Sequence, residues 1–184
     1  MAWTAPMTAT AHTAFPAASF NTHVRDNLLE TEPGRATSSY GDGSIPVKSA
    51  TNQITFRTPA FAAVTSSQST SSGSYTNLTT TGPTVTVTTG AYALVFWHAS
   101  MTNSGSGGTL MSVQVTNAGS VTHSATDQRA IRHTDESGNN GEDMFGMQFL
   151  FTDLTPGTNS FQAKYSVESG TGTYRLRRLG VIPL

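Results

Sequence analysis

The residues that could do chemistry in this chain are five histidines and one acidic loop. His12, His23, His98, His123 and His133 are spread along the sequence, and no two of them have the spacing that places metal ligands on one element. We therefore expect structural or surface roles for these histidines. His98 ends a strongly hydrophobic run, so we expect it to pack in the core.

The acidic loop runs from Asp135 to Asp143 and gathers four carboxylates among Gly and Asn residues. Oxygen ligands on a flexible loop suit Ca²⁺, but the spacing here does not fit the regular calcium-binding loop. A loop of this composition is also typical of a solvated hairpin. We predict no metal site and no cofactor, and the binding of a cation by this loop stays an open question.

Motifs for nucleophilic catalysis and for phosphate binding are missing. Ser is abundant, but the sequence has no Gly-x-Ser-x-Gly elbow of the kind that serine hydrolases use. The glycine tract Ser104–Gly108 joins two expected strands and contains no Lys, whereas a phosphate-binding loop opens a helix. The sequence therefore predicts a protein that is not an enzyme.

One basic cluster stands out near the C-terminus, at residues 175–178. Alternation along a strand would place Arg175 and Arg177 on one face and Leu176 and Arg178 on the other. The formal net charge of the chain is −1, so no general basic field attracts nucleic acid. We interpret the cluster as a solvated strand face or a subunit contact, and we predict no nucleic-acid partner.

The composition favours a β-rich fold. Charged residues make up 11% of the chain, well below the usual quarter, while Ser and Thr supply about a quarter. The chain has no Cys, so its stability must come from core burial or from oligomerisation. No apolar run is long enough to span a membrane, and Met1–Pro6 lacks the pattern of a secretory signal. We predict no membrane partner.

From Ile54 onward the sequence is organised in short apolar or alternating segments. The expected strands are Ile54–Arg57, Phe61–Val64, Tyr75–Leu78, Val85–Thr88, Ala91–Ala99, Leu110–Val115, Met144–Phe151, Ser160–Val167 and Tyr174–Ile182. Ala91–Ala99 is the most hydrophobic of them, and we expect it to be buried on both faces. Strands of this length and spacing predict an all-β fold in which two antiparallel sheets form a jelly-roll sandwich over residues 51–184.

Several large side chains of this domain are expected to stabilise the core or an interface between subunits. They are Tyr92, Phe96, Trp97, Phe149, Phe151, Tyr165 and Leu176. Their burial would replace the disulfides that the chain lacks.

Residues 1–50 are predicted to be a docking arm with one short helix and a Ser- and Gly-rich linker. Ser19 or Asn21 can cap a helix that runs to Leu29, and Glu32-Pro33-Gly34 ends it. Its apolar stripe is narrow, so we expect the helix to order against a partner or against the other subunits of its own trimer. The residues expected to dock are Trp3, Phe20, His23, Val24, Arg25, Asn27, Leu28 and Leu29.

Three segments of the β region resemble the tumour-necrosis-factor-like jelly roll. They are Gly90–Ala99, with its glycine-tyrosine opening, Ser160–Tyr165 and Gly172–Ile182. The resemblance covers roughly residues 60 to 184 and is one of pattern. Because proteins of that fold assemble as compact trimers, the resemblance implies a homotrimer.

The arm has a resemblance of its own. Ala2–Pro6 followed by Phe20–Leu29 is similar to the N-terminus of small structural proteins of tailed bacteriophages, notably those of actinobacterial and related hosts. In that family the segment often opens minor tail or virion surface proteins. The resemblance covers the first sixth of the chain, and it implies a virion protein that is assembled in the host cytoplasm.

Together these features predict a non-enzymatic phage structural protein. It would be a trimeric capsid decoration protein whose arms bind the major capsid protein or tail proteins, with three weak arms combining their affinities on a repetitive lattice. The alternative is a minor tail protein or a receptor- or carbohydrate-binding tip that uses the loops Asn103–Gly108 or Thr134–Asp143.

Overall fold

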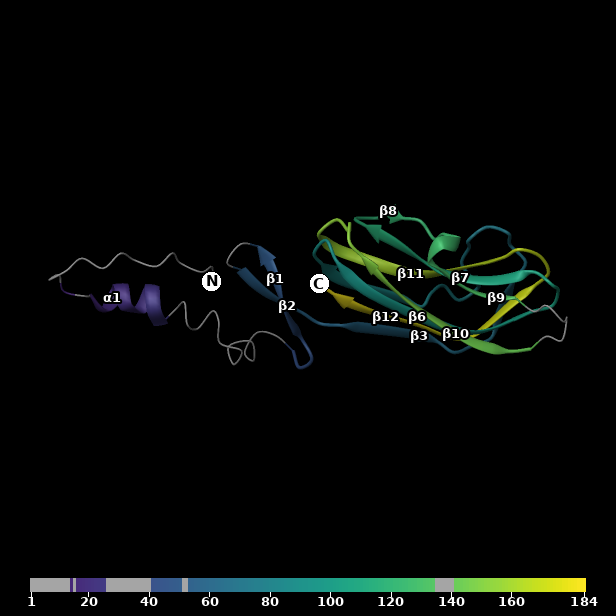
Figure 1. Cartoon of the computed structure of the whole chain (residues 1–184), viewed down its shortest axis with the longest axis horizontal. Coiled ribbons are helices and arrows are strands. Elements are labelled where there is room, and N and C mark those ends of the chain that lie inside the picture. Colours follow the sequence, from purple (N-terminus) through teal and green to yellow (C-terminus); the bar gives the residue numbers. More distant parts are fainter. Residues whose placement is uncertain (1–13, 15, 26–40, 51–52, 135–140) are drawn as a thin grey trace. The chain divides into compact units, whose positions relative to one another are not determined.

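The computed structural model describes residues 14, 16–25, 41–50, 53–134 and 141–184 (Figure 1). The chain divides into two compact units, Met1–Thr58 and Pro59–Leu184. The smaller unit holds a short helix and a two-stranded sheet, and the larger unit holds two five-stranded sheets.

The helix of the smaller unit is α1, Ala17–Phe20, and it continues as the π-helix η1, Asn21–Arg25. Pro16 precedes it with a φ of −64°, and the backbone N–H of Phe20 donates to Pro16 O at 3.1 Å. Proline fixes its own φ in the helical range, so it favours a helix start at this point. The helix therefore begins before the predicted Ser19 or Asn21, and the predicted end at Leu29 lies outside the described residues.

The smaller unit also contains an antiparallel hairpin of β1, Ile45–Ala50, and β2, Gln53–Arg57. The prediction of a strand at Ile54–Arg57 is confirmed. Residues 45–50, interpreted from the sequence as linker, form a strand because β2 pairs with them. The hydroxyls of Ser44 and Thr58 lie 2.7 Å apart at the open end of the hairpin.

The larger unit is a sandwich of two antiparallel sheets (Figure 1). Sheet I has the order β10-β6-β12-β3, with β4 also paired to β12, and sheet II has the order β5-β11-β7-β8, with β9 also paired to β7. The strands of sheet I are β3 Ala60–Val64, β4 Gln68–Thr70, β6 Ala93–Asn103, β10 Asp143–Phe151 and β12 Gly172–Pro183. The strands of sheet II are β5 Thr84–Thr89, β7 Gly108–Asn117, β8 Ser120–His123, β9 Ala130–Thr134 and β11 Gly157–Val167. A 3-10 turn, η3 (Asp127–Arg129), precedes β9. The predicted all-β, two-sheet, jelly-roll-like sandwich is confirmed.

The strand predictions fail where the pattern is short or polar. Tyr75–Leu78 is not a strand: within it Thr76 makes an isolated bridge to Tyr165. The short strands β4 and β8 were not predicted, because Ser, Thr and Gln supply too little alternation to mark them. Strand β9 was not predicted either, since its five residues contain a single large apolar side chain, Ile131.

The core lies between the two sheets. Its large side chains include Trp97, Met101, Met111, Phe151, Phe161, Tyr165, Tyr174 and Leu179, each at most 1% exposed. The polar atoms of these rings are satisfied by backbone carbonyls: Trp97 Nε1 donates to Met111 O at 3.3 Å, and Tyr165 OH donates to Gly82 O at 2.8 Å. Aromatic burial with paired polar atoms thus fixes how sheet I sits on sheet II.

Candidate functional site

The candidate site is the side of sheet I that points away from sheet II, which we call the outer face. Strand β6 shows how it arises, because its burial alternates along the strand. Its inward side chains Ala93, Val95, Trp97, Ala99 and Met101 are buried, whereas Phe96 on the opposite side is 40% exposed. The expectation that this strand is buried on both faces is therefore wrong for a single chain, since sheet II covers one face only.

Two phenylalanines form the middle of the outer face. Phe96 on β6 and Phe61 on β3 both pair with Gly180 of β12, which lies between them. A Cβ atom on Gly180 would meet Phe96 Cε2 at 2.1 Å, so the ring lies flat against the backbone of β12. Phe61 is 60% exposed. The glycine thus allows one aromatic ring to lie across β12 toward the other.

Other apolar side chains extend this surface across four strands. Leu94, Leu150 and Ile182 form the next cross-strand row, and Leu150 is 47% exposed. Tyr92 and Leu184 border this row, and the Leu184 N–H donates to Tyr92 O at 3.0 Å. A contiguous exposed apolar patch on a sheet is typical of a surface that binds another protein.

A basic row borders the apolar rows. In it Arg178 of β12 pairs with His98 of β6, and the small residues Ala63 and Gly146 lie on either side. Burial lowers the pKa of His98, and the neighbouring Arg178 guanidinium lowers it further. His98 is half-buried on the outer face and does not lie in the core as predicted.

An ion pair occupies the row beyond the basic one. Arg175 NH2 lies 2.9 Å from Glu142 Oε1, and the hydroxyl of Ser100 donates to the same carboxylate. Met144 of β10 pairs with Ser100 in the same row and is 59% exposed. Along the strands the outer face therefore runs from aromatic and aliphatic side chains through a basic row to a row that combines an ion pair with an exposed methionine.

Arg177 corrects the prediction for the basic cluster. It is fully buried, whereas strict alternation had placed it beside Arg175 on a solvated face or at a subunit contact. A β-bulge lies between Arg175 and Arg178, and Leu176 there has a φ of 48°. The extra residue turns Arg177 inward, so the sequence cluster is not a basic patch on the surface.

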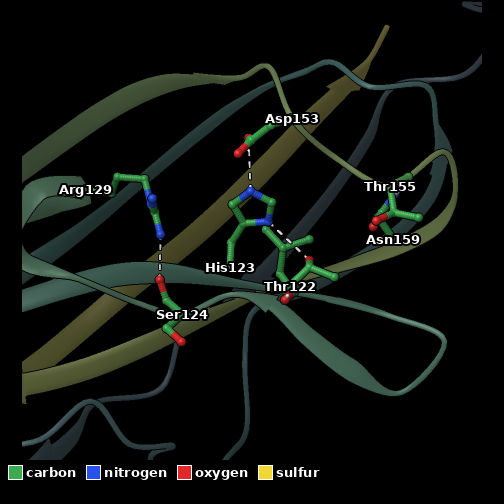
Figure 2. Close-up of polar contacts among 8 residues, drawn as sticks. Thr122, His123, Ser124, Arg129, Asp153, Thr155 and Asn159 are labelled. Atoms are coloured by element: carbon green, nitrogen blue, oxygen red, sulfur yellow. Dashed lines mark hydrogen bonds and ion pairs between the residues drawn. The ribbon is translucent and has the colours of Figure 1, made fainter.

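A second polar cluster joins the two sheets near the end of β10 (Figure 2). His123 Nε2 lies 3.0 Å from Asp153 Oδ1, and His123 Nδ1 lies 3.1 Å from Thr122 Oγ1. The ring of His123 also packs edge-on against Phe151, with centroids 5.4 Å apart. The hydrogen bond from His123 lowers the pKa of the Asp153 carboxyl.

The order of hydroxyl, imidazole and carboxylate in this cluster is that of a catalytic triad. Thr122 Oγ1, however, donates its proton to Val115 O at 3.3 Å, whereas a nucleophile must direct that proton to the imidazole. Beside it, Arg129 donates to Ser124 O (Figure 2). The guanidinium carbon of Arg129 also lies 5.5 Å from the centre of the Phe151 ring. We interpret the cluster as a structural tie between β8 and the segment that follows β10.

The loop Asn103–Gly108, a candidate for receptor or carbohydrate binding, is held against the neighbouring loop at 168–171. The buried Asn103 amide donates to Thr109 Oγ1 at 2.9 Å and to Ser169 O at 3.2 Å. Glu168 Oε2 accepts from the Gly108 N–H at 3.0 Å and from Arg132 at 2.6 Å. The loop offers hydroxyls and backbone but no aromatic ring on which a sugar could stack. Most of the other candidate loop, 135–140, lies outside the described residues.

The predicted docking residues fall only partly within the described chain. Phe20 is 47% exposed, and His23 and Val24 are half-exposed on η1. Arg25 is the last residue of η1, while Trp3, Asn27, Leu28 and Leu29 lie outside the described residues.

The predicted core and interface residues separate into two groups. Trp97, Phe151 and Tyr165 are buried in the core, and Phe149 packs against it half-buried. Tyr92 and Phe96 belong to the outer face, and Leu176 forms the bulge. The sequence analysis missed Phe61, Leu150, Arg178 and Gly180 as members of the outer face. The alternation of inward and outward residues along β3, β10 and β12 was the one pattern in the sequence that could have placed these four residues on the outer face.

Among the residues that the structure describes, no three His, Asp or Glu side chains gather as a metal site. In the same residues, no helix is long and apolar enough to cross a membrane.

Known proteins resemble this chain in fold and at low identity. No family model and no curated protein matches the sequence. The Eiger TNF of S. frugiperda matches with a TM-score of 0.46 and 11% identity, over 68% of this chain and 92% of that one. The VP2 subviral particle protein of infectious bursal disease virus matches with 0.42 and 10%, over 75% and 37%. The C-terminal CBM6 of LamC from Zobellia galactanivorans matches with 0.30 and 15%, over 78% and 94%.

Proposed function

We propose that the chain is a non-enzymatic structural protein of a bacteriophage virion. In this proposal it is a homotrimer on the particle surface, it docks through residues 1–50, and its place is that of a capsid decoration protein. The resemblance of Ala2–Pro6 and Phe20–Leu29 to phage structural proteins supports the virion, and the division of the chain after Thr58 supports a separate docking part.

The observation that carries the proposal is the outer face of sheet I. Phe61, Phe96 and Leu150 are each at least 40% exposed there, on β3, β6 and β10, and β12 lies between β3 and β6. Exposed apolar surface is unfavourable in water. Burying it between two copies would lower the free energy of the assembly by about 25 cal/mol for each Å² of apolar surface. Contact between copies at this face would provide the stability that a chain without Cys cannot take from disulfides.

The arm fits a docking role for a related reason. The described residues place a helix, α1 with η1, at Ala17–Arg25, inside the segment proposed to dock. Phe20 of this helix is 47% exposed in the described structure. Three such arms on one trimer would bind a repetitive lattice far more tightly than one arm.

Removing residues 1–35 tests the docking part of the proposal. We expect the shortened chain to fold and to form trimers, as measured by circular dichroism and analytical ultracentrifugation, because the sandwich and its outer face are intact. We expect it not to join particles in an assembly assay in which the full chain is incorporated.

Normal incorporation of the shortened chain would show that the arm is not the anchor. A full chain that sediments as a monomer would overturn the trimer. Electron microscopy of particles carrying the labelled full chain would distinguish a position on the head from one on the tail.

A further inference from the structure

The described residues of sheet I give the basic row of the outer face no counter-charge. Among the described strands of sheet I, β3 and β4 carry no titratable side chain and β6 carries only His98. On β10, Asp143 turns to His133, whose Nδ1 lies 3.6 Å from its carboxylate. Glu142 is already bound to Arg175 and Ser100. No described acidic residue of sheet I is therefore free to pair with Arg178.

The position of this row makes the missing charge important. Arg178 and His98 lie one row from Gly180 and Phe96, in the middle of the sheet. Any partner that covers the aromatic row therefore also takes the guanidinium out of water. A guanidinium stays charged at all ordinary pH values, and a buried charge without a counter-charge is strongly destabilising.

The order of the rows indicates how copies of the chain meet. A two-fold axis that lies in the plane between two facing copies, perpendicular to their strands and level with Phe96, would place the Leu94 and Ile182 row of one copy on the His98 and Arg178 row of the other. A cyclic arrangement about an axis along the strands sets equivalent rows at the same level, apolar against apolar. It also brings the Arg178 side chains of all copies together.

We propose that the assembled protein binds an inorganic oxyanion of the phosphate or sulfate class between the Arg178 side chains of neighbouring copies, with His98 as a further donor. This inference rests on the trimer of the proposed function. The planar guanidinium presents paired N–H groups that match two oxygens of such an anion. One anion with two negative charges would offset most of the charge that three copies bring to the axis.

His98 makes the binding dependent on pH. Burial and the neighbouring Arg178 both lower the pKa of His98 in the single chain, so the free protein favours the neutral imidazole. A bound anion favours the imidazolium instead. Phosphate itself loses one of its two charges near neutral pH, so the pH dependence is measured with sulfate, which keeps both charges. Sulfate binding should strengthen as the pH falls through the His98 titration.

The test compares sodium phosphate with sodium chloride at equal ionic strength and at a constant protein concentration. The probe is inorganic phosphate, and the readouts are the thermal midpoint and isothermal titration calorimetry on the trimer. We expect a saturable rise in the midpoint and measurable binding with phosphate. Arg178→Gln should weaken phosphate binding at least about tenfold, since it removes the charge-assisted hydrogen bonds.

Arg132→Gln is the matched control, because it removes the same charge from the exposed β9 surface of sheet II. It should bind phosphate as the wild type does. The control also measures the general stabilisation that phosphate gives to any protein by exclusion from the surface.

Two results would overturn the anion site and leave the trimer intact. In the first, the trimers melt at the same temperature in both salts. In the second, the Arg178→Gln trimer still responds to phosphate as the wild type does. A monomer in both salts would overturn the trimer of the proposed function and this inference with it.

Discussion

Arg177 is fully buried, although arginine is among the residues least often found inside a protein. Its guanidinium donates to Gly82 O, Ser66 O and Gln68 Oε1 at 3.5, 3.3 and 3.2 Å, and it lies 5.4 Å from the centre of the Tyr165 ring. Burial raises the pKa of Tyr165 to about 12, so this ring stays neutral beside the cation. At the residue scale, one arginine therefore fixes the segment 66–82 to the end of sheet I.

Replacing Arg177 by Met should lower the free energy of unfolding by about 2–3 kcal/mol, because three acceptors lose a buried donor. Chemical denaturation measures the change. The control is Arg132→Met, which alters an exposed ion pair and should change stability by less than about 1 kcal/mol. Equal effects of the two substitutions would contradict a specific role for the buried guanidinium.

The tie between His123 and Asp153 predicts a small acid-sensitive contribution to stability. The pKa of the Asp153 carboxyl is lowered from its ordinary 3.8, so the folded state favours the carboxylate. The stabilisation is complete above that value and is lost as the pH falls through the lower pKa of the folded state. Because the Asp153 side chain is 75% exposed, the effect should stay under about 1 kcal/mol.

Asp153→Asn tests this contribution. Urea unfolding of the variant should show a slightly reduced stability at neutral pH and a smaller further loss between about pH 5 and pH 2 than the wild type. Identical pH profiles for the two proteins would indicate that the pair does not stabilise the fold.

At the element scale, β6 and β12 decide the character of the outer face. Each presents core residues to sheet II and a second set of residues outward, and the second set has no cover within the described part of the larger unit. Gly180 is essential to this arrangement, since a side chain there would lift the Phe96 ring off β12. The two strands thus serve the fold with one side and remain available for assembly with the other.

In the proposed trimer, Phe96→Ser should give a monomer at concentrations where the wild type assembles, and it should leave the far-ultraviolet circular dichroism unchanged. The ring projects from the outer face, so its loss removes apolar surface between copies without opening the core. Sedimentation velocity measures the outcome. Val121→Ser on β8, where the side chain is 52% exposed on sheet II, is the control and should remain trimeric.

At the scale of the whole molecule, the chain separates two tasks. The sandwich of residues 59–184 contains the core and the outer face, while residues 1–58 form a unit of their own. A deletion in the arm should therefore affect attachment without affecting assembly, and a substitution on the outer face should do the reverse. The absence of Cys agrees with a protein whose stability comes from burial in the core and between copies.

The sequence by itself determined the fold class and most of the long strands. Alternation with a period of two is a local property, so Val85–Thr88, Leu110–Val115 and Met144–Phe151 were predicted at nearly their observed places. The absence of Cys and the low charge are likewise properties of the sequence alone. Strands such as β9, which exist because β7 pairs with them, could not be predicted in the same way.

Only the tertiary structure decided which faces are covered. A run as hydrophobic as Ala91–Ala99 would be stable between two layers, but sheet II covers one side of it and leaves Phe96 exposed on the other. The bulge at Leu176 likewise reverses the direction of Arg177, and no alternation rule contains it. Both outcomes depend on partners distant in the sequence, which is why local pattern predicted strands here but did not predict the surface that they form.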